Sequence, residues 1–137
     1  MKIELKRIDD AFHLEATNEA GNTLQTDGSP DIGGSNKAFR PMQLLLAGIG
    51  SCSAIDVIHF LRKQRQELED IQITVTATRH EDQVPSLFKT IHVQFRLFGD
   101  LDEKRVERSV NMSMEKYCSV AKILEKSATI SWEYSIG

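Results

Sequence analysis

The chain has 137 residues, of which 40% are hydrophobic and 27% charged, and its formal net charge is −3. This size and composition fit one soluble globular domain spanning residues 1–137. Acidic and basic residues are interspersed, which argues against nucleic acid or an anionic membrane as a partner. The first eight residues lack the apolar run of a signal peptide, so we expect a cytoplasmic protein whose thiols are kept reduced.

The N-terminal part predicts three short antiparallel strands followed by a loop. Apolar and polar residues nearly alternate from Ile3 to Thr26, with interruptions at residues 9–10 and 18–22. Residues 27–37 form the stretch richest in Gly, Ser, Asn and Asp, and no periodic pattern crosses it. We expect a surface loop there, and long loops often carry function.

Pro41 opens a long apolar segment that predicts a helix from Met42 to about Arg65. Its only formal charge between positions 44 and 61 is Asp56. A transmembrane span is the alternative, but Gly, Ser, Asp and His residues dilute the segment and no second span accompanies it, so we expect no membrane association. A helix that is apolar on nearly all sides must be buried on nearly all sides. One sheet covers one side, so we expect a second subunit to cover the other.

The C-terminal part predicts three more strands and two helices. Alternation of β-branched and polar residues predicts strands at 71–78 and 88–98, joined as a hairpin. Helical patterns cover about 102–112 and 120–124, and a last strand covers 129–136. The order is three strands, a long helix, two strands, two helices and a strand. It lacks regular βαβ alternation, so it predicts an α+β fold.

Cys52 lies on the predicted long helix, after small residues that let a substrate or another backbone approach. Asp56 and His59 share its helix face. His59 is about 10 Å away along the helix axis, too far to exchange a proton with the thiol directly. Asp56 is one turn away, and a carboxylate at that distance disfavours the thiolate unless a cation intervenes. A reactive Cys52 therefore needs a positive or hydrogen-bonding partner from another element.

Cys118 is predicted near the start of the last helix, where backbone N–H groups lower the pKa of a thiol. The two cysteines are 66 positions apart (118 minus 52), which is not the spacing of a Cys-x-x-Cys redox or zinc motif. Four scattered histidines show no ligand spacing, so we expect neither a metal nor a cofactor. The alternative is that both cysteines serve packing only, because free cysteine is among the most buried residue types.

Two motifs surround the cysteines, PMQLLLAGIGSCSAIDV at residues 41–57 and EKYCSV at residues 115–120. Together they resemble the OsmC/Ohr superfamily, and its YhfA-like branch in particular. The resemblance covers essentially the whole chain. It implies the OsmC-like α+β fold, in which antiparallel sheets surround a long buried central helix, and an intertwined homodimer with active sites at the interface.

The resemblance also implies a reaction. In members of this superfamily, the cysteine matching Cys52 attacks an organic hydroperoxide as a thiolate and becomes a sulfenic acid. The cysteine matching Cys118 then converts the sulfenic acid to a disulfide. An external thiol, often a dihydrolipoyl group, reduces the disulfide. The resemblance therefore implies a thiol-dependent peroxidase without a cofactor.

One part of the peroxidase pattern is missing here. Peroxidase members place an arginine against the thiolate and orient it with a glutamate directly after the proline. This chain has Met42 there and Gln43 next, and a neutral amide cannot pair an arginine as a carboxylate does. No arginine occurs in residues 27–38, so the nearest cations are Lys37 and Arg40, with Arg7 in the first strand as a more distant option. Arg40 is our candidate. We therefore predict Arg40 and Gln43 as site residues, and a substrate pocket lined by Met42, Asp56 and Tyr117.

Two other functions use the same residues. A dimeric binding protein would hold a small apolar or sulfur-containing ligand in the interface pocket without turnover, and the flexible Met42 in place of the acid motivates this alternative. Thiol transfer would place a persulfide or another electrophile on Cys52. The sequence does not separate thiol transfer from peroxide reduction.

Overall fold

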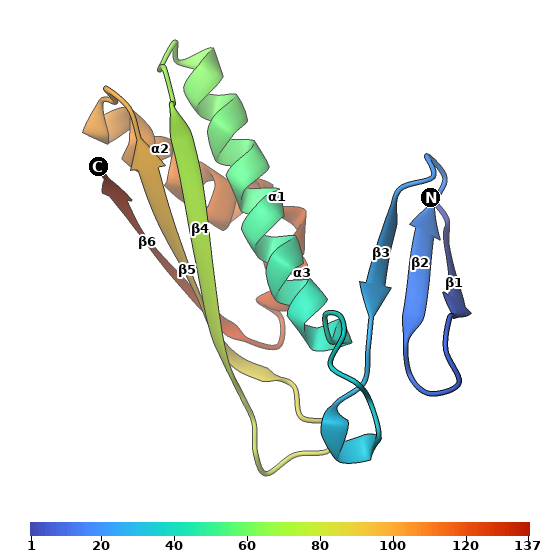
Figure 1. Ribbon diagram of the computed structural model, residues 1–137. Helices are drawn as coiled ribbons and strands as arrows, with labels where there is room; N and C mark the ends of the chain where they lie inside the picture. Colours follow the sequence, from blue (N-terminus) through green and yellow to red (C-terminus); the bar gives the residue numbers. More distant parts are fainter. The chain divides into compact units, whose positions relative to one another are not determined.

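The computed structural model describes all 137 residues, which form two compact units, residues 1–45 and 46–137. Figure 1 shows the elements, and their predicted order is confirmed. They are β1 (Ile3–Arg7), β2 (Leu14–Asn18), β3 (Thr23–Thr26), α1 (Pro41–Lys63), β4 (Asp70–Arg79), β5 (Phe88–Phe98), α2 (Glu103–Met112), α3 (Ser119–Leu124) and β6 (Thr129–Ile136). The structure adds a 3-10 turn at Pro30–Ile32 and a π-helical turn at Ser113–Tyr117.

The first unit contains a three-stranded antiparallel sheet in the order β1-β2-β3. Its register places Leu5, Ala16 and Leu24 side by side on one face. Leu5 is 59% exposed and Leu24 47% exposed, although both belong to the apolar face. A sheet this small needs a covering surface on its apolar face to be stable.

Residues 27–37 form a loop that one carboxylate holds together. Asp27 is only 2% exposed, and it accepts hydrogen bonds from the backbone N–H groups of Gly28, Ser35 and Lys37 at 2.8, 3.3 and 3.1 Å. These bonds, the one from Lys37 foremost, hold the pKa of Asp27 below its ordinary value. Most of the loop is exposed, as predicted, but its backbone is fixed by hydrogen bonds.

Both ends of helix α1 carry residues that suit their positions. Pro41 occupies its first position, the Gln43 side chain accepts the Arg40 N–H at 3.1 Å, and basic residues in the last turn suit the helix dipole. By length and composition α1 could cross a membrane, since an 18-residue window has a mean hydropathy of 1.8. Only 28% of that window is buried in the single chain. The all-round burial predicted for this helix is therefore not reached within one chain.

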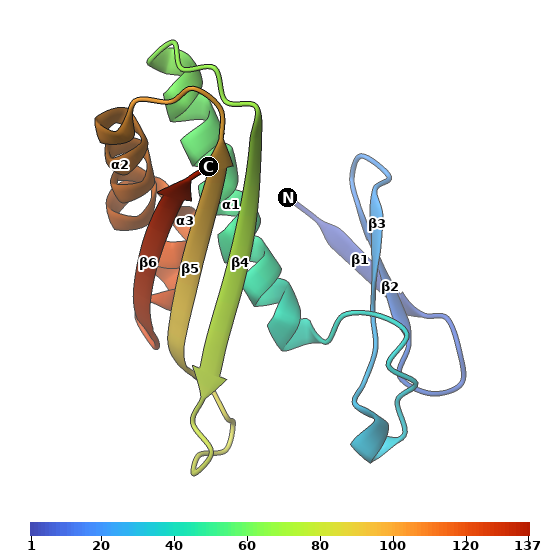
Figure 2. The ribbon, with the colours of Figure 1, turned by 60° about the vertical axis from the view of Figure 1, so that its left-hand side comes forward.

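The second unit packs its helices on one face of a three-stranded sheet, as Figures 1 and 2 show. Alternate residues of β5 point into the core and are fully buried, namely Ile91, Val93, Phe95 and Leu97. Helix α1 approaches β4 closely at Gly50, where an added Cβ atom would lie 3.1 Å from Val75 Cγ2. The opposite sheet face carries polar side chains and faces solvent.

The direction of β6 differs from the prediction of antiparallel sheets. β4 and β5 pair antiparallel, as expected for the hairpin, but β6 runs parallel to β5. The physical reason is the connection, because α2, the π-helical turn and α3 return the chain to the start of β5. A parallel pair requires a crossover of this kind.

Candidate functional site

Cys118 lies at the junction between the π-helical turn and α3. Its backbone is extended, with φ −70° and ψ 103°, and its N–H donates to the Ser113 carbonyl oxygen at 2.7 Å. Its Sγ accepts the Ala121 N–H at 3.4 Å, so the sulfur caps α3. The side chain is fully buried. Cys118 therefore holds a structural position and could also present a thiol to the interior.

Cys52 lies half-buried on α1, and both cysteines are free thiols. Burial raises the pKa of Cys118 from 9.0 to about 11, while the Ala121 N–H acts in the opposite direction. The neighbouring Cys52 and the charge of Asp56 raise this pKa further. Cys52, which is 66 positions away in the sequence, is therefore near enough in the fold to act on the thiol of Cys118. The predicted lowering of the pKa of Cys118 at a helix start is wrong, because desolvation outweighs the single backbone N–H.

Asp56 and Tyr117 connect α1 to the π-helical turn beside the cysteines. The Ser113 hydroxyl donates to Asp56 Oδ2 at 2.9 Å, and Asp56 is half-buried. The Tyr117 ring meets the Phe60 ring edge-on, with the ring centres 5.3 Å apart. Two of the three residues predicted for the pocket therefore lie near a cysteine in the chain, Asp56 on the helix of Cys52 and Tyr117 directly before Cys118. Lys116 Nζ lies 5.1 Å from the Tyr117 ring centre and is the cation of this group.

Arg40, Met42 and Gln43 lie in the first unit, around the start of α1. Gln43 accepts the Arg40 N–H, which gives Gln43 a capping role. The Arg40 Nε atom is buried without a hydrogen-bond partner. Along α1, Gln43 precedes Cys52 by nine residues, about 14 Å by helix rise. This spacing does not support a direct action of Arg40, Met42 or Gln43 on Cys52 of the same chain. Their roles in the site remain predictions.

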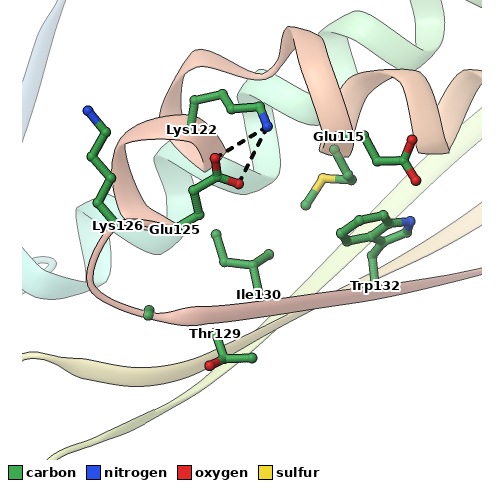
Figure 3. Close-up of a pocket in the computed structure, with 9 residues that line it drawn as sticks. Glu115, Lys122, Glu125, Lys126, Thr129, Ile130 and Trp132 are labelled. Carbon is green, nitrogen blue, oxygen red and sulfur yellow. Dashed lines mark hydrogen bonds and ion pairs between the residues drawn. The ribbon is translucent and has the colours of Figure 1, made fainter.

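A groove of the second unit is lined by residues other than the cysteines. It has a volume of about 620 Å³ and lies between α3 and β6 (Figure 3). Ile130 and Trp132 form its apolar wall, and Lys122 pairs with Glu125 at 3.3 Å on the opposite side. Trp132 is held by a hydrogen bond from its Nε1 to Asn111 Oδ1 at 2.9 Å. Neither Cys52 nor Cys118 lines this groove.

The chain has no group of three or more His, Cys, Asp or Glu side chains placed to hold a metal ion. His59 is exposed on α1, and its ring lies 6.1 Å from that of Phe60. The reactive groups at this site are the two thiols, and a carboxylate and a hydroxyl that are hydrogen-bonded to each other lie beside them.

The raised pKa of Cys118 predicts a pH dependence of stability. The folded thiol keeps its proton up to about pH 11, whereas an unfolded thiol loses it near 9.0. Stability from this group is therefore fully present below about pH 9 and is lost as the pH rises towards about 11. We expect the difference in unfolding free energy between wild type and Cys118→Ala to shrink over this range, as measured by urea unfolding. If the difference in unfolding free energy between the two proteins stayed constant from pH 9 to pH 11, the burial of the Cys118 thiol would be contradicted.

Ser113 was not predicted as a site residue. Its hydroxyl reaches Asp56 across 57 positions, and the π-helical turn that brings it there has no sequence signature. In the sequence, a serine between two methionines is typical of an ordinary packed helix. Only the contact with Asp56 in the folded chain indicates that Ser113 belongs to the site.

Comparisons with known proteins agree with one another. The family model described as OsmC-like protein matches residues 34–133. Protein YhfA of Escherichia coli strain K12 is 40% identical over 118 residues, covering 85% of this chain and 84% of that protein. A crystal structure of a hypothetical protein from Aquifex aeolicus is 35% identical, with a TM-score of 0.81 and coverage of 99% and 96%. An organic hydroperoxide resistance protein OsmC from Legionella pneumophila shares the fold, with 20% identity, a TM-score of 0.73 and coverage of 98% and 97%.

Proposed function

The chain belongs to the family of OsmC-like proteins, and from that membership we propose that it is a thiol-dependent peroxidase for organic hydroperoxides. Some structural neighbours are named organic hydroperoxide resistance proteins. The observation that carries the proposal is the juxtaposition of two free thiols, Cys52 half-buried and Cys118 buried beside it.

The reaction proceeds in two steps on these thiols. Cys52 sulfur, as the thiolate, attacks the terminal oxygen of the hydroperoxide, and the O–O bond breaks. The alkoxide takes a proton and leaves as an alcohol, and Cys52 becomes a sulfenic acid. Cys118 sulfur then attacks Cys52 sulfur, the S–O bond breaks, and the hydroxide leaves as water with the proton from Cys118. An external thiol restores both cysteines by exchange with the disulfide.

The different exposure of the two cysteines supports their different roles. A peroxide must reach the attacking sulfur, and Cys52 is the accessible one. A buried thiol with a raised pKa is a poor first nucleophile but resists oxidation by solvent peroxide. Cys118 is therefore suited to react only with an oxidised sulfur at its own side.

A direct test is the rate at which reduced protein consumes cumene hydroperoxide with dithiothreitol or dihydrolipoamide as reductant. The expected result is catalytic turnover with an organic hydroperoxide and slower turnover with hydrogen peroxide. If the protein turned over no hydroperoxide with dithiothreitol and none with dihydrolipoamide, the proposal would be contradicted.

We propose that the active protein is a homodimer, because α1 exposes apolar surface in the single chain. Ile55 on this helix is 65% exposed, which is costly for a large aliphatic side chain in water. In the dimer, Arg40 and Gln43 of the second copy are the candidates to approach Cys52, since helix rise separates them from it in one chain.

The dimer predicts a specific mutational effect. Ile55→Glu should convert the dimer largely to monomer, because the interface would bury an unpaired carboxylate. Val84→Glu is the matched control, since Val84 is also an exposed apolar residue but lies in the β4–β5 loop. Sedimentation at micromolar concentration should find wild type and the control as dimers. A monomeric wild type, or dimeric Ile55→Glu, would contradict this placement.

A non-catalytic binding protein is the second candidate. It is favoured by Met42 at the position where the peroxidase pattern has an acid, and by the absence of a hydrogen-bond partner at Arg40 Nε. Such a protein would hold a small apolar or sulfur-containing ligand, which native mass spectrometry of protein isolated from its host would detect. Rapid peroxide turnover by the ligand-free protein would decide for the peroxidase.

A further inference from the structure

The π-helical turn is fastened to α1 at two points beside the cysteines. Ser113 binds Asp56 through its hydroxyl, and Tyr117 packs edge-on against Phe60. On α1, Cys52, Asp56 and Phe60 follow one another at intervals of four residues, so they form one row on the helix surface. The π-helical turn therefore contacts the same row of α1 side chains that begins with Cys52.

Ser113 also fixes the backbone of Cys118. Its carbonyl oxygen accepts the Cys118 N–H at 2.7 Å, which closes the wide π-helical ring. Its side chain is fully buried, and the hydroxyl also faces the Ser53 carbonyl oxygen at 3.5 Å. One residue thus links α1, through its side chain, to Cys118, through its backbone. A π-helical turn is rare and often marks a functional position.

Closure of a disulfide is demanding in geometry. The S–S bond is about 2.05 Å long, and the two Cα atoms must lie within about 7 Å with the side chains directed at each other. A misplacement of about 1 Å at a reacting atom slows a reaction by about a hundredfold. The position of Cys118 relative to α1 therefore sets the rate at which it can attack Cys52.

We propose that Ser113 and Asp56 are positioning residues for the resolving step, and that their hydrogen bond holds the π-helical turn so that the sulfur of Cys118 faces Cys52. The inference rests on the proposed function for the source of the sulfenic acid. In that step the S–S bond forms as the S–O bond breaks. Cys52 sulfur is reduced, Cys118 sulfur is oxidised, and the proton of Cys118 leaves with the hydroxide as water.

The first test separates the two chemical steps with a set of buried-serine variants. Ser113→Ala should slow disulfide formation by roughly tenfold or more, because the hydrogen bond to the carboxylate is lost. Consumption of the first equivalent of cumene hydroperoxide should stay within about twofold of wild type, and a dimedone-reactive sulfenic acid should accumulate. Ser113→Thr keeps the hydroxyl and should restore disulfide formation to within about threefold of wild type.

Ser109→Ala is the matched control. Ser109 is also fully buried and also makes a long-range hydrogen bond, in which its hydroxyl accepts from Gln64 Nε2 at 2.7 Å, but it lies on α2. Its loss should leave both steps within about twofold of wild type. Equal slowing of closure by Ser109→Ala and Ser113→Ala would overturn the proposal, since it would show a general effect of packing.

A double-mutant cycle adds a readout that simple destabilisation would not give. Asp56→Ala should slow closure as Ser113→Ala does, and the double variant should be no slower than either single variant. Additive slowing would mean that the two residues act independently, which contradicts the proposal.

A second assay measures closure without peroxide. Wild-type Cys52 is converted to a mixed disulfide with thionitrobenzoate, and attack by Cys118 releases the coloured thiolate as the Cys52–Cys118 bond forms. The same variants should rank in the same order. If the Cys52–Cys118 disulfide forms in this assay but the protein consumes no peroxide, the proposed peroxidase function is contradicted and the positioning role is supported. Failure of wild type to close in this assay would overturn the positioning role itself.

Discussion

Replacement of Cys52 by serine should abolish peroxide reduction, with a loss on the order of a thousandfold or more in the thiol-dependent rate. The serine hydroxyl stays protonated at neutral pH, and it cannot be oxidised to the equivalent of a sulfenic acid. The variant should fold normally, because Cys52 is half-buried and the exchange removes little volume. The measurement is consumption of cumene hydroperoxide with dihydrolipoamide as reductant.

Cys118→Ser is the matched partner of this variant, since it leaves Cys52 as the single cysteine of the chain. It should consume one equivalent of peroxide at nearly the wild-type rate and stop at a sulfenic acid that dimedone traps. Turnover in Cys52→Ser, or loss of the first step in Cys118→Ser, would show that the two roles are wrongly assigned.

Gly34→Ala should disrupt the loop of residues 27–37 and with it the first unit. A Cβ atom at Gly34 would overlap the backbone carbonyl group of Gly28, which has no flexible end that can move aside. Separation of these backbones would also break the hydrogen bonds that hold Ser35 and Lys37 on Asp27. We expect a destabilisation of about 3 kcal/mol for this unit, at the upper end for overpacking. Hydrogen exchange of the β1–β3 amides should rise accordingly.

Gly48→Ala provides the contrast for this effect. Gly48 lies inside α1, and an added Cβ atom there would lie 3.6 Å from Val120 Cγ1, an ordinary contact. Alanine is a better helix former than glycine, so this variant should be neutral or stabilising by about 0.5 to 1 kcal/mol. Similar protection of the β1–β3 amides in Gly34→Ala and in wild type would contradict the close approach of Gly34 to Gly28.

The elements were predictable wherever the local pattern matches the local environment. The strands at 70–79 and 88–98 alternate because one sheet face is packed against helices and the other is solvated. The start of α1 followed from Pro41, which suits the first helical position. The direction of β6 was not predictable, since alternation is the same in parallel and antiparallel pairs and only the crossover decides it.

The site was predictable only in part, because its chemistry depends on tertiary contacts. Resemblance to a family selected Cys52 and Cys118, and the fold brings them together. The raised pKa of Cys118 reflects burial by elements distant in sequence, so its place at the start of a helix was misleading. Asp56 was expected to act on the thiol of Cys52, but its hydrogen-bond partner is Ser113, which only the π-helical turn brings within reach.

The central claim is that Cys52 and Cys118 form a disulfide at the expense of an organic hydroperoxide. Its most direct test is mass spectrometry of fully reduced protein after one equivalent of cumene hydroperoxide, followed by peptide mapping. We predict a chain lighter by two hydrogen atoms, with a bond between the peptides that contain Cys52 and Cys118. Persistence of both free thiols at stoichiometric peroxide would contradict the account.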